Sequence, residues 1–344
     1  MSMPSARLIA AFAVCAALCT PRVTHATVPV LVWRGVSDAP FRGAAAATVD
    51  PAGHLYVDSM DSVDVFASYS LRAGRWRTLS PLTRVLPTGL SALAAVAGRV
   101  YGFGASISSP DNPNPDNAYV YQVATGRWGA IAYAPTDHGG GAAVATKNGR
   151  IYVMAGGDAQ SPIGGAMESY DPRTGNWQPR ARMHVARFEP AAVIEPDGRV
   201  YVLGGVSDDR RGAGTFATSS VEAYDPRADR WTILAPMPTA RAGLAAALGR
   251  EGRIYAIGGT PDSINDPQGR AWPRALSTVE IYDPRTNRWH RGPNLGVARW
   301  SLAAAALPDG AIYAIGGIGV GDDSLPTVER LPVPATSPLS SNER

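Results

Sequence analysis

Cysteine and lysine are scarce in this chain. Of its 344 residues only two are cysteine, Cys15 and Cys19, and only one is lysine, Lys147. Because both cysteines lie close to the N-terminus, a disulfide framework cannot hold the remaining chain together. The apolar run that contains them, residues 8–19, is too short to span a bilayer, which takes about 20 apolar residues.

This N-terminal run has the layout of a secretory signal. Arg7 precedes it, and Thr24 and Ala26 stand just ahead of the cleavage point that such a layout predicts. We therefore predict that residues 1–26 are a signal peptide, with an uncleaved membrane anchor as the alternative. Alanine, arginine and proline are frequent, as in GC-rich bacterial genomes, so we expect a periplasmic or secreted bacterial protein.

Neither sign of charge dominates the rest of the chain. Residues 27–344 hold 30 basic and 29 acidic side chains, which leaves a net charge near +1. Without a basic surface, nucleic acid is not an expected partner. The sequence also lacks a serine nucleophile elbow, a phosphate-binding loop and a dinucleotide fingerprint.

Repetition is the main feature that the sequence does have. Four segments each join a hydrophobic strand to a glycine pair: GRIYVMAGG (149–157), GRVYVLGG (198–205), GRIYAIGG (252–259) and GAIYAIGG (310–317). Three of them are followed by a second shared phrase: ESYDPRTGNW (168–177), EAYDPRADRW (222–231) and EIYDPRTNRW (280–289). A period of about 50 residues with several short strands in each period predicts a β-propeller.

Six blades account for these repeats. Each contains one tryptophan: Trp33, Trp76, Trp128, Trp177, Trp231 and Trp289. Runs of small residues are expected to form the innermost strands, because large side chains would crowd the axis: 44–48, 92–96, 141–144, 190–194, 244–248 and 302–306. The last blade lacks its own tryptophan strand, so we predict that residues 30–33 supply it and close the ring. The prediction is an all-β, six-bladed propeller over residues 27–332, followed by a disordered tail, 333–344.

The glycine pair, tyrosine and tryptophan of these phrases resemble the kelch repeat. The resemblance covers roughly residues 44–331 and departs in the first two blades, which have YVDSM (56–60) and GFG (102–104) at the glycine positions. It implies a kelch-type propeller, most often a rigid binding module for a protein or glycan. Kelch propellers also include copper-radical oxidases and the periplasmic N-acetylneuraminate epimerases, which act on an acidic sugar without a metal.

The residues argue against a metal centre. The resemblance implies that copper-radical chemistry would need a tyrosine crosslinked to cysteine, and residues 27–344 contain no cysteine. The histidines fall in different blades without ligand spacing, so we expect no metal and no cofactor. An epimerase would need a catalytic acid or base, for which Glu189 is the first candidate. We expect a monomeric binding module, with a cofactor-free sugar epimerase or mutarotase as the alternative.

The ligand is expected on one face of the propeller. Loops between the second and third strands, and between blades, leave an antiparallel blade on the same side, and several of them are long: 105–118, 158–166, 206–219, 260–276 and 318–326. The residue before each inner strand is Gly89 in the second blade and, in the other five, a predicted ligand group: Arg42, His138, Arg187, Arg241 and Arg299. Arginines around the channel mouth would favour an acidic group. A structural role within the repeat is the alternative.

Two tryptophans stand outside the blade pattern. Trp272 lies in the longest loop, and Trp300 directly follows Arg299. Together with the arginines they suit an acidic carbohydrate, because aromatic rings stack on the apolar faces of sugars while guanidinium groups bind carboxylates. The expected partner on this face is therefore a protein or a carbohydrate. Packing of a loop against the propeller is the alternative role for Trp300.

Overall fold

The computed structural model describes residues 31–43, 45–59, 65–82, 90–104, 118–157, 163–208, 215–261, 274–321 and 323–333. The chain divides into two compact units, Met1–Val30 and Leu31–Arg344. The first unit, which includes the predicted signal peptide, lies outside the described residues, as does the predicted tail apart from Val333. The second unit contains all the strands that follow.

Three four-stranded antiparallel sheets form the first half of this unit. Blade 1 contains β2 (Ala45–Val49), β3 (His54–Ser59), β4 (Phe66–Ser70) and β5 (Arg75–Thr78). Blade 2 contains β6 (Ala92–Val96), β7 (Arg99–Phe103), β8 (Ala118–Gln122) and β9 (Arg127–Ala130). Blade 3 contains β10 (Ala142–Ala145), β11 (Ile151–Met154), β12 (Met167–Asp171) and β13 (Asn176–Pro179).

Three more sheets complete the set. Blade 4 contains β14 (Ala191–Ile194), β15 (Val200–Leu203), β18 (Val221–Asp225) and β19 (Arg230–Ile233). Blade 5 contains β20 (Ala245–Leu248), β21 (Ile254–Ile257), β22 (Val279–Asp283) and β23 (Arg288–Arg291). Blade 6 contains β24 (Ala303–Ala306), β25 (Ala311–Ile315), β26 (Val328–Pro332) and β1 (Arg34–Gly35). The prediction of six blades is confirmed, and the described residues include no helix.

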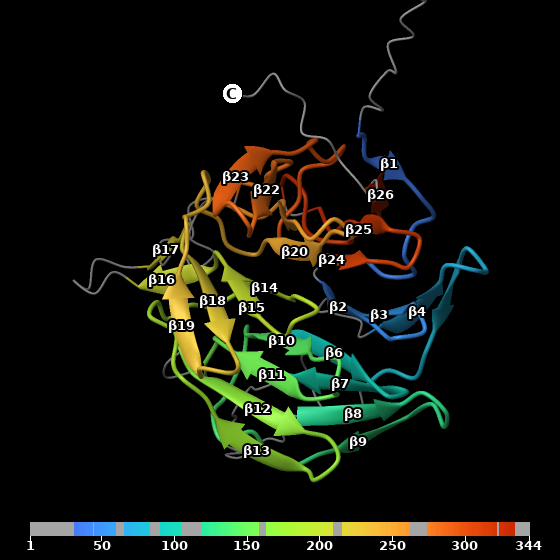
Figure 1. Cartoon of the computed structure of the whole chain (residues 1–344). Helices are drawn as coiled ribbons and strands as arrows, with labels where there is room; N and C mark the ends of the chain where they lie inside the picture. The colour runs from blue at the N-terminus through green and yellow to red at the C-terminus, as the bar shows by residue number, and fades with distance from the viewer. Residues whose placement is uncertain are drawn as a thin grey trace, which may run out of the picture. The chain divides into compact units, whose positions relative to one another are not determined.

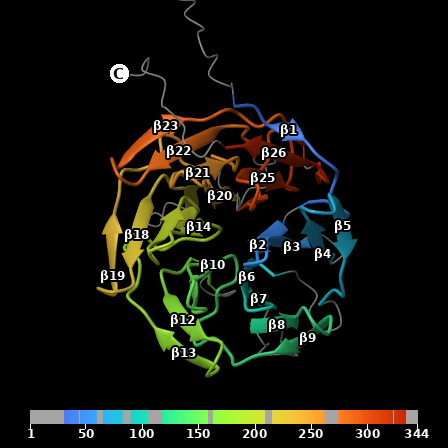
Figure 2. The same cartoon turned by 45° about the vertical axis from the view of Figure 1, so that its right-hand side comes forward.

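The inner strands meet around a central axis (Figures 1 and 2). Each inner strand contacts the inner strand of the next blade, and β24 of blade 6 contacts β2 of blade 1, so the ring is continuous. Alanine dominates these strands, as in Ala303–Ala306. Small side chains allow six strands to approach one axis, whereas the larger Tyr, Ile and Val side chains fill the layers between blades.

The N-terminal strand closes the ring by pairing with β26, with Arg34 opposite Arg330 and Gly35 opposite Glu329. Residues 30–33 were predicted for this role, but the strand starts at Arg34, directly after the predicted segment. Pro332 would face residue 32 and has no N–H with which to extend the ladder. Trp33 nevertheless takes its predicted place in the repeat, because its indole N–H donates to the carbonyl of Pro293, 2.9 Å away.

The same hydrogen bond recurs between other neighbouring blades. In each case a tryptophan donates to the carbonyl four residues beyond the tryptophan of the preceding blade: Trp128 to Ser80, Trp177 to Ala132, Trp231 to Ala181 and Trp289 to Ala235. Since Pro293 stands four residues beyond Trp289, Trp33 belongs to this series. The first strand of the chain is thereby fixed both to blade 6 and to blade 5. Trp76 of blade 1 does not belong to the series, because its indole nitrogen is buried without a hydrogen-bond partner among the described residues.

A buried ion pair organises each of blades 4, 5 and 6. Three arginines, each placed just before an inner strand, are fully buried and lie within 2.6 to 2.7 Å of a glutamate: Arg187 with Glu222, Arg241 with Glu280 and Arg299 with Glu329. The Nη1 atom of each arginine also donates to two backbone carbonyls of its own blade. Burial lowers the pKa of the three arginines, and the paired glutamates oppose that shift.

Blades 1 and 3 vary this arrangement. In blade 3, His138 replaces the arginine and hydrogen-bonds Glu168 and the carbonyl of Ala155. Burial raises the pKa of Glu168, but hydrogen bonds from His138 and Thr136 outweigh burial and leave it below its ordinary value. In blade 1, Ala67 stands at the glutamate position and Arg42 is exposed. The buried pair therefore forms where the repeat supplies both partners.

Replacing Trp33 with alanine is expected to destabilise the protein by about 3–5 kcal/mol, the usual cost of truncating a buried aromatic side chain. Its side chain is 6% exposed and joins the cluster between blades 5 and 6. Val32, half exposed, provides the control, and Val32→Ala should change stability by less than about 0.5 kcal/mol. Denaturant unfolding followed by fluorescence measures both. Equal small effects would show that the N-terminal strand does not secure the ring.

Replacing Arg241 with alanine is expected to cost about 3–5 kcal/mol, because Glu280 would remain buried without its partner. Arg42→Ala removes the exposed arginine at the same repeat position in blade 1. That change should alter stability by less than about 0.5 kcal/mol. Denaturant titration of the two variants is the measurement, and comparable losses at both positions would contradict a structural role for the buried pairs.

Candidate functional site

Loops from all blades gather on the face where the second strand of each blade ends and the next blade begins, which we call the long-loop face. Much of it lies outside the described residues: 105–117, 158–162, 209–214, 262–273 and 322. The segment 206–219 was predicted as a loop, but it contains a two-stranded ribbon of β16 (Val206–Asp208) and β17 (Thr215–Ala217). Backbone pairing thus extends the sheet structure of blade 4 into this face.

At the centre of the long-loop face, one repeat position from each of four blades forms a hydrogen-bonded arc around the axis. Its members are Gly140, Glu189, Gly243 and Ser301, each two residues before an inner strand. The amide of Glu189 donates to Gly140 O (2.7 Å), that of Gly243 to Glu189 O (3.3 Å) and that of Ser301 to Gly243 O (2.6 Å). In blade 2, the Ser91 hydroxyl oxygen continues the arc by accepting from the amide of Gly140, 3.2 Å away.

All four positions in this arc have a positive φ, between 50° and 63°. Glycine adopts that conformation without steric cost, whereas Glu189 and Ser301 do so under local backbone strain. Strained non-glycine residues persist where the surrounding structure fixes them, and they cluster at functional sites. The arc fixes Glu189 and Ser301 through the hydrogen bonds that their own amides donate to Gly140 and Gly243.

The arc surrounds a small axial recess with a volume of about 100 Å³, lined by the four arc residues, Ser91 and the adjoining residues of blades 3 to 6. Farther along the axis lies a second cavity of about 120 Å³, lined by alanines from the inner strands of all six blades. The recess is therefore the mouth of a channel that the inner strands of all six blades line. Glu189 is the one acidic side chain in its lining.

Glu189 has an unusual environment for a carboxylate. Its Oε2 atom is buried and has no hydrogen-bond partner in the described part of the chain. Gly243 leaves space for it: a β-carbon on Gly243 would lie 3.4 Å from Glu189 Oε2 and 3.4 Å from Cε3 of Trp300. Burial raises the pKa of Glu189 to about 7. Near neutral pH the group therefore populates both its protonated and its ionised form.

The predicted ring of arginines is not at the channel mouth. Arg187, Arg241 and Arg299 are 0% exposed, so a ligand could reach their guanidinium groups only if the blades opened. His138 is 2% exposed and is held inside blade 3. The structural role raised as the alternative fits these four residues. Sequence spacing placed them correctly in the repeat, but the direction of each side chain depends on a glutamate from another strand.

The other predicted ligand residues have different outcomes. Arg42 is exposed on blade 1, and its ligand role stays a prediction. Trp300 is 9% exposed, pairs its backbone with Ile318 and packs beside Gly243 at the edge of the recess. Trp272 lies outside the described residues. Glu189, the candidate acid or base, lines the recess, and its Oε2 atom has no hydrogen-bond partner among the described residues.

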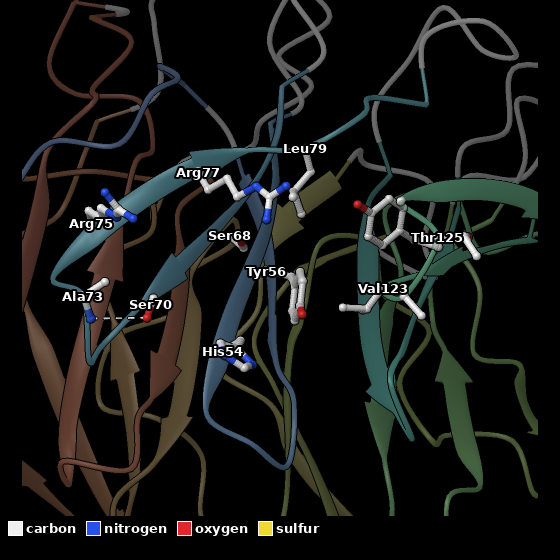
Figure 3. A pocket seen from close by; sticks show the side chains of 13 residues that line it. His54, Tyr56, Ser68, Ser70, Ala73, Arg75, Arg77, Leu79, Val123 and Thr125 are labelled. Carbon is white, nitrogen blue, oxygen red and sulfur yellow. Dashed lines mark hydrogen bonds between the residues drawn. The ribbon is translucent and has the colours of Figure 1, made fainter.

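One large cavity was missed by the sequence analysis. It lies between blades 1 and 2, has a volume of about 580 Å³ and involves the short hairpins on the side opposite the long-loop face (Figure 3). Aligning the repeats offers only part of the signal, since blade 2 has Gly126 where blades 4 and 5 have Asp229 and Asn287, but blades 1 and 3 also have glycine there, Gly74 and Gly175. A missing side chain at a repeated position leaves open space between the blades.

The described residues contain no group of three or more His, Cys, Asp or Glu side chains that could hold a metal ion. Nor does this part of the chain include a helix with the length and apolar character needed to cross a membrane.

Comparison with known sequences identifies the repeat. A model of the KLHDC2/KLHL20/DRC7 Kelch-repeats domain matches residues 61–317. Kelch-like protein 36 of Mus musculus is 33% identical over 191 residues, or 55% of this chain and 29% of that protein. Kelch-like protein 34 of Homo sapiens is 31% identical over 212 residues, which are 58% of this chain and 31% of that protein. The match thus spans less than a third of either relative.

Comparison with solved structures supports the same fold. The structure of YjhT has a TM-score of 0.67 at 16% identity and covers 86% of this chain and 96% of that one. A fungal alcohol oxidase of the AA5 family, in complex with copper, has a TM-score of 0.60 at 16% identity. The match covers 90% of this chain and 79% of the oxidase chain. At such low identity these likenesses show the fold alone. Because the family model spans most of the six-bladed ring, this chain belongs to the kelch-repeat β-propeller family.

Proposed function

We propose that this kelch propeller is an exported, monomeric binding module whose long-loop face takes up a carbohydrate, with a polar group of the sugar entering the axial recess. The observation that carries the proposal is that Glu189, a residue of the recess lining, has a buried Oε2 atom without a hydrogen-bond partner among the described residues. A buried polar atom gains most from a ligand that completes its hydrogen bonding. A sugar hydroxyl can do so, since it both donates and accepts.

The surroundings of Glu189 support a sugar over a simple ion. Trp300 borders the same position beside Gly243 and supplies an apolar surface of the kind on which sugar rings pack. Because Arg187, Arg241 and Arg299 are used inside the blades, the recess has no unpaired arginine to attract an anion. The recess therefore favours a hydroxyl group, and an acidic sugar would direct its carboxylate elsewhere, for example toward exposed Arg42.

Catalysis is the second candidate function, and the pKa of Glu189 is the observation that favours it. A carboxyl group with a pKa of about 7 can both take and give a proton near neutral pH. In anomer exchange, a base removes the proton of the anomeric hydroxyl while an acid protonates the ring oxygen, and the bond between the anomeric carbon and that oxygen breaks. Rotation and reclosure then give the other anomer. The resemblance to N-acetylneuraminate epimerases motivates this alternative.

A protein partner is the remaining outcome. Kelch propellers commonly bind proteins, and the described part of the long-loop face exposes the apolar side chains of Phe216 (47%) and Val320 (72%). Such residues suit the centre of a protein interface. Only the carbohydrate proposal depends on the recess. It therefore requires Glu189 to bind the ligand, whereas a protein partner does not.

Thermal unfolding in a panel of neutral hexoses, sialic acids and uronic acids tests the proposal. A sugar at ~100 times its dissociation constant should add about 2.7 kcal/mol of stability. Glu189→Gln should abolish the shift, whereas Glu195→Gln, on the β14–β15 hairpin away from the recess, should retain it. The same samples, followed by NMR, reveal catalysis as accelerated anomer exchange. If no sugar shifts the wild-type transition, a protein partner becomes the better assignment.

Stability should also depend on pH through Glu189. Its pKa rises from 4.5 to about 7 on burial, so the folded state holds this proton more tightly than the unfolded state does. The resulting stabilisation is complete below about pH 4.5 and disappears as pH rises through 7. Relative to Glu189→Gln, the wild type should lose up to about 3 kcal/mol between pH 4.5 and 8. Urea titrations at several pH values provide the measurement, and a constant difference would contradict the raised pKa.

A further inference from the structure

The cavity between blades 1 and 2 differs from the axial recess in position and chemistry. One wall comes from β3, β4 and β5 of blade 1, and the other from Tyr121 and the turn of residues 123–126 in blade 2. Figure 3 shows Arg75 and Arg77 along β5, with Tyr56 and Val123 on opposite sides of the opening. At about 580 Å³ the groove falls in the size range of small-molecule sites.

The groove has uncompensated positive charge. Arg75 and Arg77 make no ion pair with any described residue, and both are exposed. Blade 3 has the neutral residues Asn176 and Gln178 at these positions. Blade 1 also has Ser70 where blades 3 and 5 have aspartates that pair with arginines, Asp171 and Asp283.

The nearest acid on this wall is already engaged. Asp50 Oδ2 lies 3.0 Å from His54 Nδ1 and accepts a longer hydrogen bond, 3.5 Å, from the Tyr56 hydroxyl. Asp50 Oδ1 accepts from the backbone amide of His54 at 2.8 Å. The two arginines therefore determine the sign of the groove, and an anionic group is the charge that complements it.

The repeat itself indicates which anion the groove suits. In blade 4, Asp229 Oδ1 accepts from the Tyr224 hydroxyl (2.7 Å) and from the amide of Ala181 (3.0 Å). In blade 5, Asn287 Oδ1 accepts in the same way from the Tyr282 hydroxyl (2.7 Å) and from the amide of Ala235 (2.9 Å). An sp² oxygen of a carboxylate or amide thus joins a tyrosine to the preceding blade.

Blade 2 has no such oxygen. Gly126 stands at the position of Asp229 and Asn287, as Gly74 and Gly175 do in blades 1 and 3. Blade 2 differs from blades 1 and 3 in the groove and the two arginines beside this position. The Tyr121 hydroxyl has no hydrogen-bond partner among the described residues. A β-carbon on Gly126 would lie 3.6 Å from that hydroxyl with no closer atom. The amide equivalent to those of Ala181 and Ala235 belongs to Ser80, four residues beyond Trp76. Donors for an acceptor oxygen are present, but the side chain that would supply it is not.

We propose that this groove binds the carboxylate of a small ligand the size of a uronic acid. One carboxylate oxygen takes the place of the missing Asp229-type oxygen and accepts from the Tyr121 hydroxyl and the Ser80 amide. Arg77, whose charge already influences Tyr121, pairs with the carboxylate. The hydroxyls of Ser68 and Ser70 line the remaining space, where they can bind the polar part of the ligand. This inference does not rest on the proposed function of the long-loop face.

Calorimetric titration with D-glucuronate tests the proposal, with D-glucose as the uncharged analogue and D-glucose 6-phosphate as a different anion. Glucuronate should bind, and Arg77→Gln should weaken it by about tenfold or more, as expected on loss of a charge-assisted hydrogen bond. Arg127→Gln is the matched control, because Arg127 occupies the repeat position of Arg75 in blade 2 but does not line the groove. Glu189→Gln should leave this binding unchanged, which separates it from binding in the axial recess.

A second variant tests the site without a ligand. Gly126 has a φ of 69°, close to those of Asp229 (45°) and Asn287 (54°), so Gly126→Asp restores a conformation that this repeat position already accommodates. The variant should raise the melting temperature by about 2–4 °C and prevent glucuronate binding. Adding Tyr121→Phe and Arg77→Gln to the Gly126→Asp variant should remove its gain in melting temperature.

Three results would overturn the proposal. The first is a wild-type protein that does not bind glucuronate together with a Gly126→Asp variant that gains no stability, since the groove would then not favour a carboxylate. The second is equally tight binding of glucuronate and glucose 6-phosphate, which would show a general anion site. Glucuronate binding that survives Gly126→Asp would likewise place the ligand elsewhere.

Discussion

Hydrogen bonds that pass from one blade to the next hold the ring together, and the other features of the molecule depend on them. On the outside, the indole N–H of a tryptophan reaches a carbonyl of the connection that leaves the preceding blade, as in Trp231 to Ala181 at 2.8 Å. Near the axis, backbone amides link the blades, as in Ser301 to Gly243 at 2.6 Å. Each four-stranded sheet buries apolar side chains on both faces, so its stability requires neighbours on both sides.

The axial hydrogen bonds explain why the recess has its chemistry. They hold one residue of each linked blade at positive φ, where glycine is favoured, and Gly140 and Gly243 follow that rule. Glu189 does not, although it has the same conformation and leaves a carboxylate oxygen buried without a partner. A strained backbone and an unsatisfied polar atom in one residue both reduce stability, so their coincidence at the mouth of the channel points to a role in ligand uptake.

Differences between the blades decide which polar side chains have a partner inside the protein. The arginines of blades 4, 5 and 6 have glutamate partners and lie inside their blades, whereas blade 1 has Ala67 at the glutamate position and leaves Arg42 exposed. Blades 4 and 5 fill the space beside a tyrosine hydroxyl with Asp229 and Asn287, whereas Gly126 leaves it open. A residue type alone therefore does not indicate function in a propeller. Its partner within the blade decides whether the group is available to a ligand.

The sequence by itself determined the six blades, the alanine-rich inner strands, the closure by the N-terminus and the kelch family. These follow from local features, since strand alternation, glycine pairs and the tryptophan spacing recur within each period of the chain. It also singled out Glu189 as a candidate acid or base. Only the tertiary structure decided that Arg187, Arg241 and Arg299 face inward, that Glu189 has no partner and that a groove opens beside Gly126. Each of these depends on which side chain a separate strand or neighbouring blade brings within a few ångströms, and sequence spacing along one blade does not specify that contact.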